Sequence, residues 1–466
     1  MEENDMLIKN IKQHEIELIH EKTLYILENV GVIFEHPDLI DYFKRLGVKT
    51  EGYKVFFDRA TVERALGTLV PSFTLKTPWE SVKVGEGGRA ISTASGARNI
   101  MQRDGSLKVP TLEDYKKIRM LDATNPVVNV SSSPLTFLSD VPQDKVDLVK
   151  MAVTLQHSTH PVIASCIKKK DAEETIELAR RFYGVEDGYY VIGVGNVISP
   201  LRYDKNDVEA ILSYSVRNLP VVIACCSTPG MTSPITVGGS IVTNNAEVLA
   251  GLIMTQLVNP GCPVVYGNVT FCSNMRVAWP TSWGPESAVM IQYAATMAQF
   301  YKVPYRVGGN LSVAKSLDWQ DGAQAAMAIQ TTLDCGCNFF FHACGELDCL
   351  NIFSMEKYVL DEELLKQRIQ AEEREYITEE AINMESIEDV GPGGNYLLED
   401  DTLELYPEEF YTSPLFSCES YDKWESLGRK TVLERAAEMV DKRMESYVAP
   451  EYTPEQMAIL EAAMKY

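Results

Sequence analysis

Basic residues are scarce in this sequence. Its 466 residues include 43 Lys and Arg against 66 Asp and Glu, which gives a formal net charge of −23. A surface that binds nucleic acid needs the opposite sign, so we expect no nucleic-acid partner. Hydrophobic residues make up 45% of the chain and charged residues 23%, a balance typical of an ordinary globular protein.

Long apolar runs, an export signal and dense cysteine are also missing. No run of about 18 apolar residues occurs, so we expect no membrane-spanning helix. The start of the chain, Met1–Asp5, is acidic, whereas a signal peptide begins with basic residues, and this predicts a cytoplasmic protein. Ten cysteines are too few for a disulfide scaffold, and we interpret most of them as reduced core residues.

From about residue 90 onward, short apolar runs alternate with segments of helical periodicity. This alternation predicts a parallel sheet of α/β class. The expected strands are 90–96, 127–133, 161–167, 189–196, 220–226, 263–268, 305–310 and 338–343. The expected helices are 112–122, 143–157, 171–182, 205–217, 243–258, 285–301 and 321–335. Eight such strands indicate a (β/α)8 TIM barrel, although a hairpin over 73–79 and 81–85 would shift the count by one.

The chain divides into three predicted regions. Residues 1–89 form an N-terminal cap, with helices over 8–29 and 37–46 and a hairpin over 48–58. Residues 90–350 form the barrel. Residues 351–466 form a C-terminal helical extension, whose strongest helices are 355–374 and 423–446, with a break at Gly391–Gly394. These long exposed helices favour a homo-oligomer.

An apolar strand ends abruptly in titratable residues at Phe339–Glu346. In a TIM barrel the active site lies at the C-terminal ends of the strands. Of six histidines, His342 alone lies at such an end. We interpret His342 and Glu346 as candidate catalytic residues. The alternative is a histidine satisfied by a neighbouring carbonyl or by Glu346.

A zinc site is a second hypothesis for the same segment. His342, Cys344 and Cys349 could supply three ligands and leave a fourth position open, as in a zinc-dependent methyltransferase or hydrolase. The spacing lacks the Cys-x-x-Cys signature, however, and the cysteines fit better as core residues. We therefore expect no metal.

Several other residues near the strand ends are candidates for binding a substrate. Arg306 lies in a strand otherwise fit for burial, where a guanidinium is costly unless it meets an anion. That anion is either a substrate carboxylate or an internal acidic side chain. The rings of Tyr266, Trp283 and Trp319 could hold a quaternary ammonium, although most such aromatics pack helices against the sheet. Polar residues that end strands complete the set: Asn196 and Asn268.

Three segments resemble the trimethylamine methyltransferase superfamily over nearly the full chain. They are Ala94–Ile100, Gly308–Asn310 followed by Asp318–Gly322, and the helical tail. The trimethylamine enzymes carry pyrrolysine near the start of the helix after the seventh strand. The matching stretch here, Asp318–Gln324, has only ordinary residues. The sequence is therefore similar to members that act on glycine betaine, proline betaine or carnitine.

This resemblance implies methyl transfer from a quaternary amine to the Co(I) of a separate corrinoid (cobalamin) protein, with no cofactor bound by this chain. It implies a TIM barrel in which Tyr266, Trp283 and Trp319 cage the ammonium. Arg306 would fix a carboxylate, and His342 would hold that carboxylate or a bridging water. The amine leaves as a neutral group, so positioning carries most of the catalysis. A third hypothesis is a betaine-binding protein without catalysis.

Overall fold

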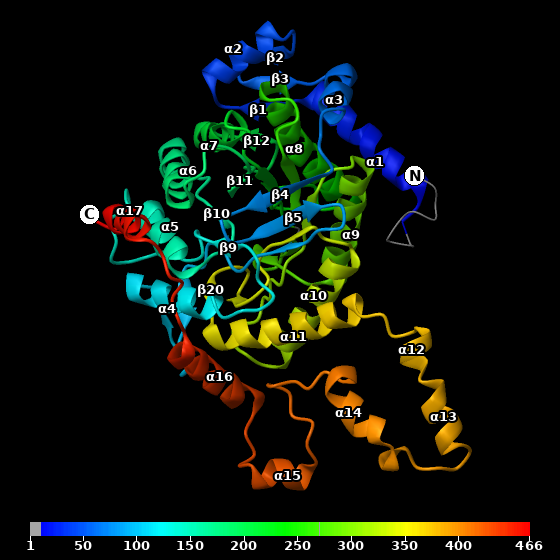
Figure 1. The fold of residues 1–466 in the computed structure, drawn as a ribbon. Helices are drawn as coiled ribbons and strands as arrows, with labels where there is room; N and C mark the ends of the chain where they lie inside the picture. The colour runs from blue at the N-terminus through cyan, green and yellow to red at the C-terminus, as the bar shows by residue number, and fades with distance from the viewer. Residues whose placement is uncertain (1–10, 270) are drawn as a thin grey trace.

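The computed structural model describes residues 11–269 and 271–466. Its largest sheet has six parallel strands in the order β17-β14-β13-β11-β10-β9, and it curls inside a layer of helices (Figure 1). A parallel pair, β18-β6, bonds to both edges of this sheet: Val130 N donates to Ile91 O at 3.1 Å, and Asn338 N donates to Tyr305 O at 3.1 Å. These strands are β6 (Ala90–Ile91), β9 (Ser131–Ser132), β10 (Val162–Ile163), β11 (Val191–Asn196), β13 (Val221–Cys225), β14 (Val264–Asn268), β17 (Tyr305–Val307) and β18 (Phe339–Phe340).

Each of these strands lies within a segment predicted as a strand, and the helices between them match the predicted ones. They are α4 (Leu112–Asp122), α5 (Val146–His157), α6 (Lys169–Tyr183), α7 (Lys205–Ser215), α8 (Val237–Val258), α9 (Pro285–Phe300) and α10 (Trp319–Asp334). Side-chain caps fix several starts: Thr111 caps α4, Asp204 caps α7 and Asp318 caps α10. Such caps satisfy backbone N–H groups that the first turn leaves free.

A hairpin covers the end of the sheet where the strands begin. It is formed by β4 (Ser72–Lys76) and β5 (Ser81–Gly85), which pair antiparallel. Lys76 N donates to Tyr189 O at 2.8 Å, just before β11. The inward residues of the hairpin pack with inward residues of the strands in one apolar cluster: Phe73, Leu75, Val82, Val84, Val130, Ile163, Ile192, Val222, Val265 and Phe339. This interior is therefore filled by side chains at the hairpin end.

The N-terminal segment packs on the outside of α8. It contains α1 (Gln13–Tyr25), a π-helical turn (Ile26–Val30), β1 (Val32–Phe34), α2 (Pro37–Arg45), β2 (Lys49–Glu51), β3 (Lys54–Phe56) and α3 (Arg59–Leu66). The predicted hairpin over 48–58 is β2–β3. The sequence prediction missed α3, which Asp58 caps. β1 also pairs in parallel with β12 (Arg202–Tyr203), and Asn245 on α8 donates to Thr23 Oγ1 at 2.8 Å.

Helix α8 is long and apolar enough to span a membrane by length and composition alone. It packs between α1 and the sheet, and 83% of its most apolar 18-residue window is buried inside the protein. It is thus a core helix in this fold.

The C-terminal segment is helical, as predicted, but the helix predicted over 423–446 is wrong. Two helices occupy it, α15 (Tyr421–Ser426) and α16 (Val432–Ser446). Gly428 and Arg429 between them adopt positive φ, which ends α15, and Thr431 caps α16. The other helices are α11 (Met355–Glu373), α12 (Glu379–Ile382), α13 (Met384–Val390), a 3-10 turn (Tyr396–Leu398), α14 (Asp400–Glu409) and α17 (Pro454–Ala463).

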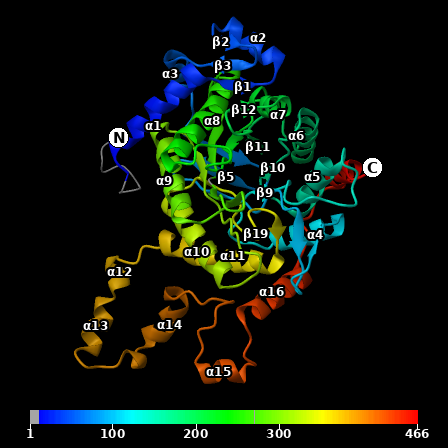
Figure 2. The ribbon, with the colours of Figure 1, turned by 180° about the vertical axis from the view of Figure 1, so that it is seen from behind.

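Short strands complete the structure. They are β7 (Asn99–Met101), β8 (Leu107–Lys108), β15 (Cys272–Asn274), β16 (Trp279–Thr281), β19 (Glu346–Leu347) and β20 (Ile352–Phe353). The sheet β19-β20-β7-β8 joins the segment after β18 to the segment after β6. Figure 2 shows the same fold from behind, with α10 and α11 crossing the lower edge of the body.

Candidate functional site

A cavity of about 360 Å³ lies at the C-terminal ends of the strands. Residues from five of the parallel strands, or from the turns directly after them, line its inner part: Ala164, Cys166, Asn196, Ala224, Cys226, Arg306, Phe341 and His342. Alternate residues of a strand face the same side, so Asn196, Cys226 and Phe341 continue the inward rows of Ile192, Val222 and Phe339 in the apolar cluster. The cavity is thus at the edge of the sheet to which the sequence assigns the active site.

Arg306 is the charged residue at the base of this cavity. It sits in β17 opposite Gly267 of β14, and its side chain is only 1% exposed. The guanidinium lies 5.4 Å from the centre of the Phe341 ring. Within the described part of the chain, its buried Nε and Nη1 have no hydrogen-bond partner. A buried guanidinium with unused donors can bind an anion strongly.

The neighbours of Arg306 leave its charge without a direct ion pair among the described residues. Burial lowers the pKa of Arg306 to about 10, so it still carries a proton at neutral pH. Glu346 contributes a weaker long-range attraction. The cation therefore remains available to an anionic ligand.

His342 and Glu346 form a buried pair beside Arg306. His342 Nδ1 lies 2.7 Å from Glu346 Oε2, and Ser95 N donates to Glu346 Oε1 at 3.1 Å. Burial lowers the pKa of His342 despite the carboxylate, which favours the neutral ring at pH 7. A ring that donates through Nδ1 presents Nε2 as an acceptor. The contact with Glu346 given above as the alternative is present, and His342 also lines the cavity.

The outer part of the cavity carries charges that the sequence prediction missed. Lys150 lies 3.0 Å from Asp147, and Ser165 donates to Asp147 Oδ2 at 3.1 Å. Asp171 lies beside them, and burial raises its pKa. The three charged residues lie in α5 or α6, and both helices begin at the same edge of the sheet as the predicted site. In the sequence, only their position near the start of a helix that follows a strand indicates that they lie near the site.

Four of the predicted substrate-binding residues are not brought to the cavity. Tyr266 and Asn268 alternate with the inward Val265 and therefore lie on the opposite face of β14. Tyr266 donates to Asn245 Oδ1 of α8 at 3.0 Å. Trp283 is buried in the main core. Trp319, at the start of α10, is 89% exposed. The predicted cage of Tyr266, Trp283 and Trp319 is thus not assembled, and the rings that line the cavity are Phe137 and Phe341.

The proposed zinc ligands are also dispersed. Cys344 is buried in the main core, whereas Cys349 packs in a separate cluster, where its thiol donates to Pro280 O at 3.6 Å. Burial raises the pKa of Cys344 well above its usual value. Over residues 11–269 and 271–466, no group of three or more His, Cys, Asp or Glu side chains is placed to hold a metal ion.

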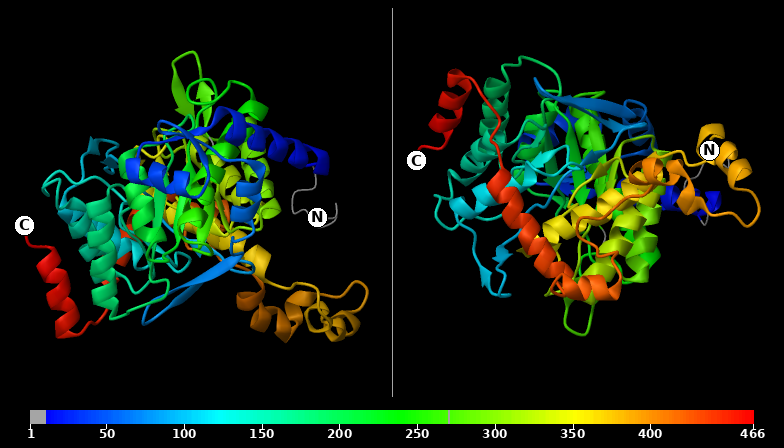
Figure 3. Two further views of the ribbon diagram at one scale, coloured as in Figure 1. Left: turned by 90° about the horizontal axis from the view of Figure 1, so that it is seen from above. Right: turned by 60° about the horizontal axis from the view of Figure 1, so that its bottom comes forward.

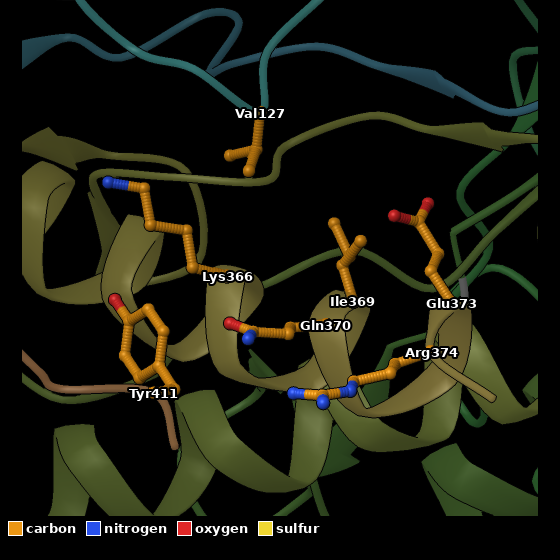
Figure 4. Close-up of a pocket in the computed structure, with 7 residues that line it drawn as sticks. All are labelled: Val127, Lys366, Ile369, Gln370, Glu373, Arg374 and Tyr411. Carbon is orange, nitrogen blue, oxygen red and sulfur yellow. The ribbon is translucent and has the colours of Figure 1, made fainter. Parts of the chain in front are cut away.

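A second hollow lies along α11, away from the strand ends (Figure 4). It has a volume of about 300 Å³ and is lined by side chains of α11 together with Val127 and Tyr411. Tyr411 donates to Glu363 at 2.9 Å. The hollow therefore lies between α11 and the returning chain, and it contains no inward residue of the sheet.

Comparison with known proteins identifies the family of this chain. The model of the family "Trimethylamine methyltransferase (MTTB)" matches residues 1–465. The chain belongs to this family. It is 31% identical to glycine betaine methyltransferase of Desulfitobacterium hafniense over 97% of this chain and 95% of that protein.

Two other relatives of this family member come from Eubacterium limosum. Its L-carnitine:corrinoid methyltransferase is 28% identical over 96% of this chain and 95% of that protein. Its proline betaine:corrinoid methyltransferase is 28% identical over 97% and 96%. Among solved structures, the Methanosarcina barkeri monomethylamine methyltransferase has a similar fold, with a TM-score of 0.52 at 9% identity over 96% of this chain and 90% of that one. The family resemblance inferred from the sequence is confirmed.

Proposed function

We propose that this chain transfers a methyl group from a betaine, a quaternary amine that carries a carboxylate, to the Co(I) of a corrinoid bound to a separate protein. The observation that carries this proposal is Arg306, a buried guanidinium with unused donors in the cavity wall. The relatives named for glycine betaine, carnitine and proline betaine support it, because each of these compounds joins a carboxylate to a quaternary nitrogen.

A zwitterion matches the charges that line the cavity. Its carboxylate would bind Arg306, with His342 Nε2 holding a bridging water and Asn196 donating from the end of β11. Its ammonium would lie against the Phe341 and Phe137 rings, whose faces attract cations, within the field of Asp147 at the outer part of the cavity. In this arrangement Phe137 and Phe341 take the cage role first assigned to Tyr266, Trp283 and Trp319.

The proposed reaction needs little acid–base catalysis from the protein. The C–N bond breaks, its electron pair stays on nitrogen, and the amine leaves neutral while the methyl group goes to the acceptor. The chain contributes orientation and exclusion of water. Glu346 holds His342 in one orientation. The corrinoid is carried by the partner protein, so it is a substrate of this chain rather than its resident cofactor.

The fold proposed for this reaction is a complete (β/α)8 barrel. The hydrogen bonds that join the pair β18-β6 to both edges of the six-stranded sheet support it. Residues 1–89 would form the cap, 90–350 the barrel and 351–466 the helical extension, with the cavity at the barrel mouth.

The test is methylation of reduced cobalamin, or of a corrinoid protein, by a panel of amines. Glycine betaine, proline betaine, carnitine and γ-butyrobetaine have the carboxylate, whereas choline and trimethylamine are controls without it. We expect a carboxylated compound to react and both controls to fail. A reaction with trimethylamine alone would refute the proposal. Binding of a betaine without turnover would favour the non-catalytic alternative, and stoichiometric zinc in the purified protein would favour the zinc alternative.

A further inference from the structure

Among the segments without a buried residue, one projects from the body (Figure 1). It covers residues 375–410, called here the arm, and comprises α12, α13, the 3-10 turn and α14. Figure 1 shows it projecting below the body, and the views of Figure 3 show the same separation. The arm is held at its two ends, where Arg374 pairs with Glu409 and Tyr411 donates to Glu363. Between these points nothing in the described chain covers it.

The arm exposes large apolar side chains. Leu397, Leu398 and Leu403 are 80%, 79% and 78% exposed, and Ile377 and Phe410 are exposed as well. Helices as short as α12, α13 and α14 are marginal in water unless an apolar face packs on something. A cluster of exposed apolar residues of this kind marks an interaction surface. The arm therefore needs a covering surface outside its own chain.

The charge of the arm indicates which kind of surface can cover it. Residues 375–410 contain twelve acidic residues and no Lys, Arg or His. Two arms would repel each other, so arm-to-arm pairing is disfavoured, and a complementary surface must be basic. None of the residues that line the cavity belongs to the arm.

A basic surface lies at the end of the molecule opposite the arm. Residues 41–54, called here the cap tip, contain Lys44, Arg45, Lys49 and Lys54 against two acidic residues, Asp41 and Glu51. Lys44 and Lys49 each meet one neighbouring carboxylate, at 3.0 and 3.4 Å, and remain more than half exposed. Exposed Leu46 and Tyr53 supply apolar area between these charges. In Figure 1 the cap tip is at the top of the molecule and the arm at the bottom.

We propose that the arm of one copy binds the cap tip of a second copy, so that the protein assembles head to tail. The contact joins two different surfaces, so an open assembly keeps one free arm at one end and one free tip at the other until it closes into a ring. A second copy of the chain is present wherever the first is, so it is a partner that can always cover the exposed apolar residues of the arm. The inference is independent of the proposed reaction.

Sedimentation velocity of three variants of the full chain tests this contact. The arm variant replaces Leu397, Leu398 and Leu403 by Ser, and the tip variant carries Arg45→Glu, Lys49→Glu and Lys54→Glu. Val448→Ser, at an 84% exposed position outside both surfaces, is the matched control. We expect wild type and control to sediment as multimers and both variants as single chains, with unchanged circular dichroism spectra.

Mixing the two variants gives the sharper result. The intact arm of the tip variant meets the intact tip of the arm variant, so an equimolar mixture should form dimers and nothing larger. A monomeric wild type would overturn the proposal. So would a tip variant that keeps the wild-type mass, or a mixture that stays monomeric.

Discussion

Two buried cations in this protein differ in how their charges are balanced. Lys357 on α11 is fully buried, and its Nζ lies 2.9 Å from both Asp321 and Asp361. Arg306 in the cavity is equally buried, yet it has no direct carboxylate partner within the described chain, and two of its donors are unused. Burying a charge is costly unless it is paired. The paired cation fastens helices together, whereas the unpaired one is the residue to which we assign the substrate carboxylate.

The pairing of Lys357 also reaches the candidate site. Asp361 Oδ2 accepts a hydrogen bond from Gly345 N at 2.8 Å, one residue before Glu346. Gly345 has φ +93°, and a Cβ there would lie 2.5 Å from the Phe353 ring, so the turn requires glycine. The balanced charges of α10 and α11 thus fix the turn that carries His342 and Glu346.

The largest effect should follow removal of the paired cation. Lys357→Met would leave two buried carboxylates without their partner, so we expect a loss of about 3–5 kcal/mol in the free energy of unfolding. Urea denaturation followed by circular dichroism measures it. The control is Lys170→Met, an exposed lysine 3.9 Å from Glu174, for which less than about 1 kcal/mol is expected. An equal loss of unfolding free energy in the two variants would show that the buried ion pair stabilises the protein no more than the surface pair does.

Removal of the unpaired cation should act on binding instead. Arg306→Met is expected to raise the KM for a betaine about 100-fold, since a lost charged contact of about 2.7 kcal/mol corresponds to that ratio. Its free energy of unfolding should stay the same or rise, because an unpaired buried charge is removed. Arg217→Met, at an exposed position in the turn after α7, serves as the control for both measurements. An unchanged KM would show that Arg306 is not the carboxylate site.

The smallest effect concerns Asp207 on α7, an anion without a compensating cation. Its Oδ2 is buried and has no hydrogen-bond partner among the described residues, and burial, together with Asp204, raises its pKa to about 7. In the unfolded chain its pKa is about 3.9, so the folded state loses stability as pH rises from about 4 to about 7. Asp207→Asn should remove this loss. Because the side chain is only half-buried, we expect a gain of about 1 kcal/mol at pH 8 and none near pH 4.

Thermal unfolding of wild type and Asp207→Asn across this pH range tests the sign. Asp187→Asn, in the exposed turn after α6, should leave the profile of wild type unchanged. A gain in stability at pH 4 rather than pH 8 would contradict the linkage argument.

The sequence predicted the strand and helix positions well because hydrophobic periodicity records which face of each element is buried. It placed Arg306, His342 and Asn196 near one another for the same reason, since parallel strands end at one edge. The prediction for Tyr266 and Asn268 is wrong because it considers only that their strand ends at the site, and not which face of the strand each side chain occupies. Alternation from Val265 would have put both on the outer face.

The remaining differences lie where backbone geometry outweighs composition. Trp319 follows the cap residue Asp318 and points to solvent, although its residue type favours burial. Trp283 and His342 both adopt positive φ, which periodicity does not encode. Gly428 divides the last predicted helix for the same reason. Loop conformations at the strand ends, which decide the walls of the cavity, depend on contacts between distant segments.

The β4–β5 hairpin has a kinetic consequence for the proposed reaction. Because its side chains plug the end of the sheet opposite the cavity, a small molecule enters and leaves on the same side that a docking protein would cover. Turnover would then be ordered: the betaine loads first, the acceptor closes the entrance, and the demethylated amine waits for the acceptor to depart. Excess acceptor protein should consequently slow the steady state, since it traps the empty or product-filled site.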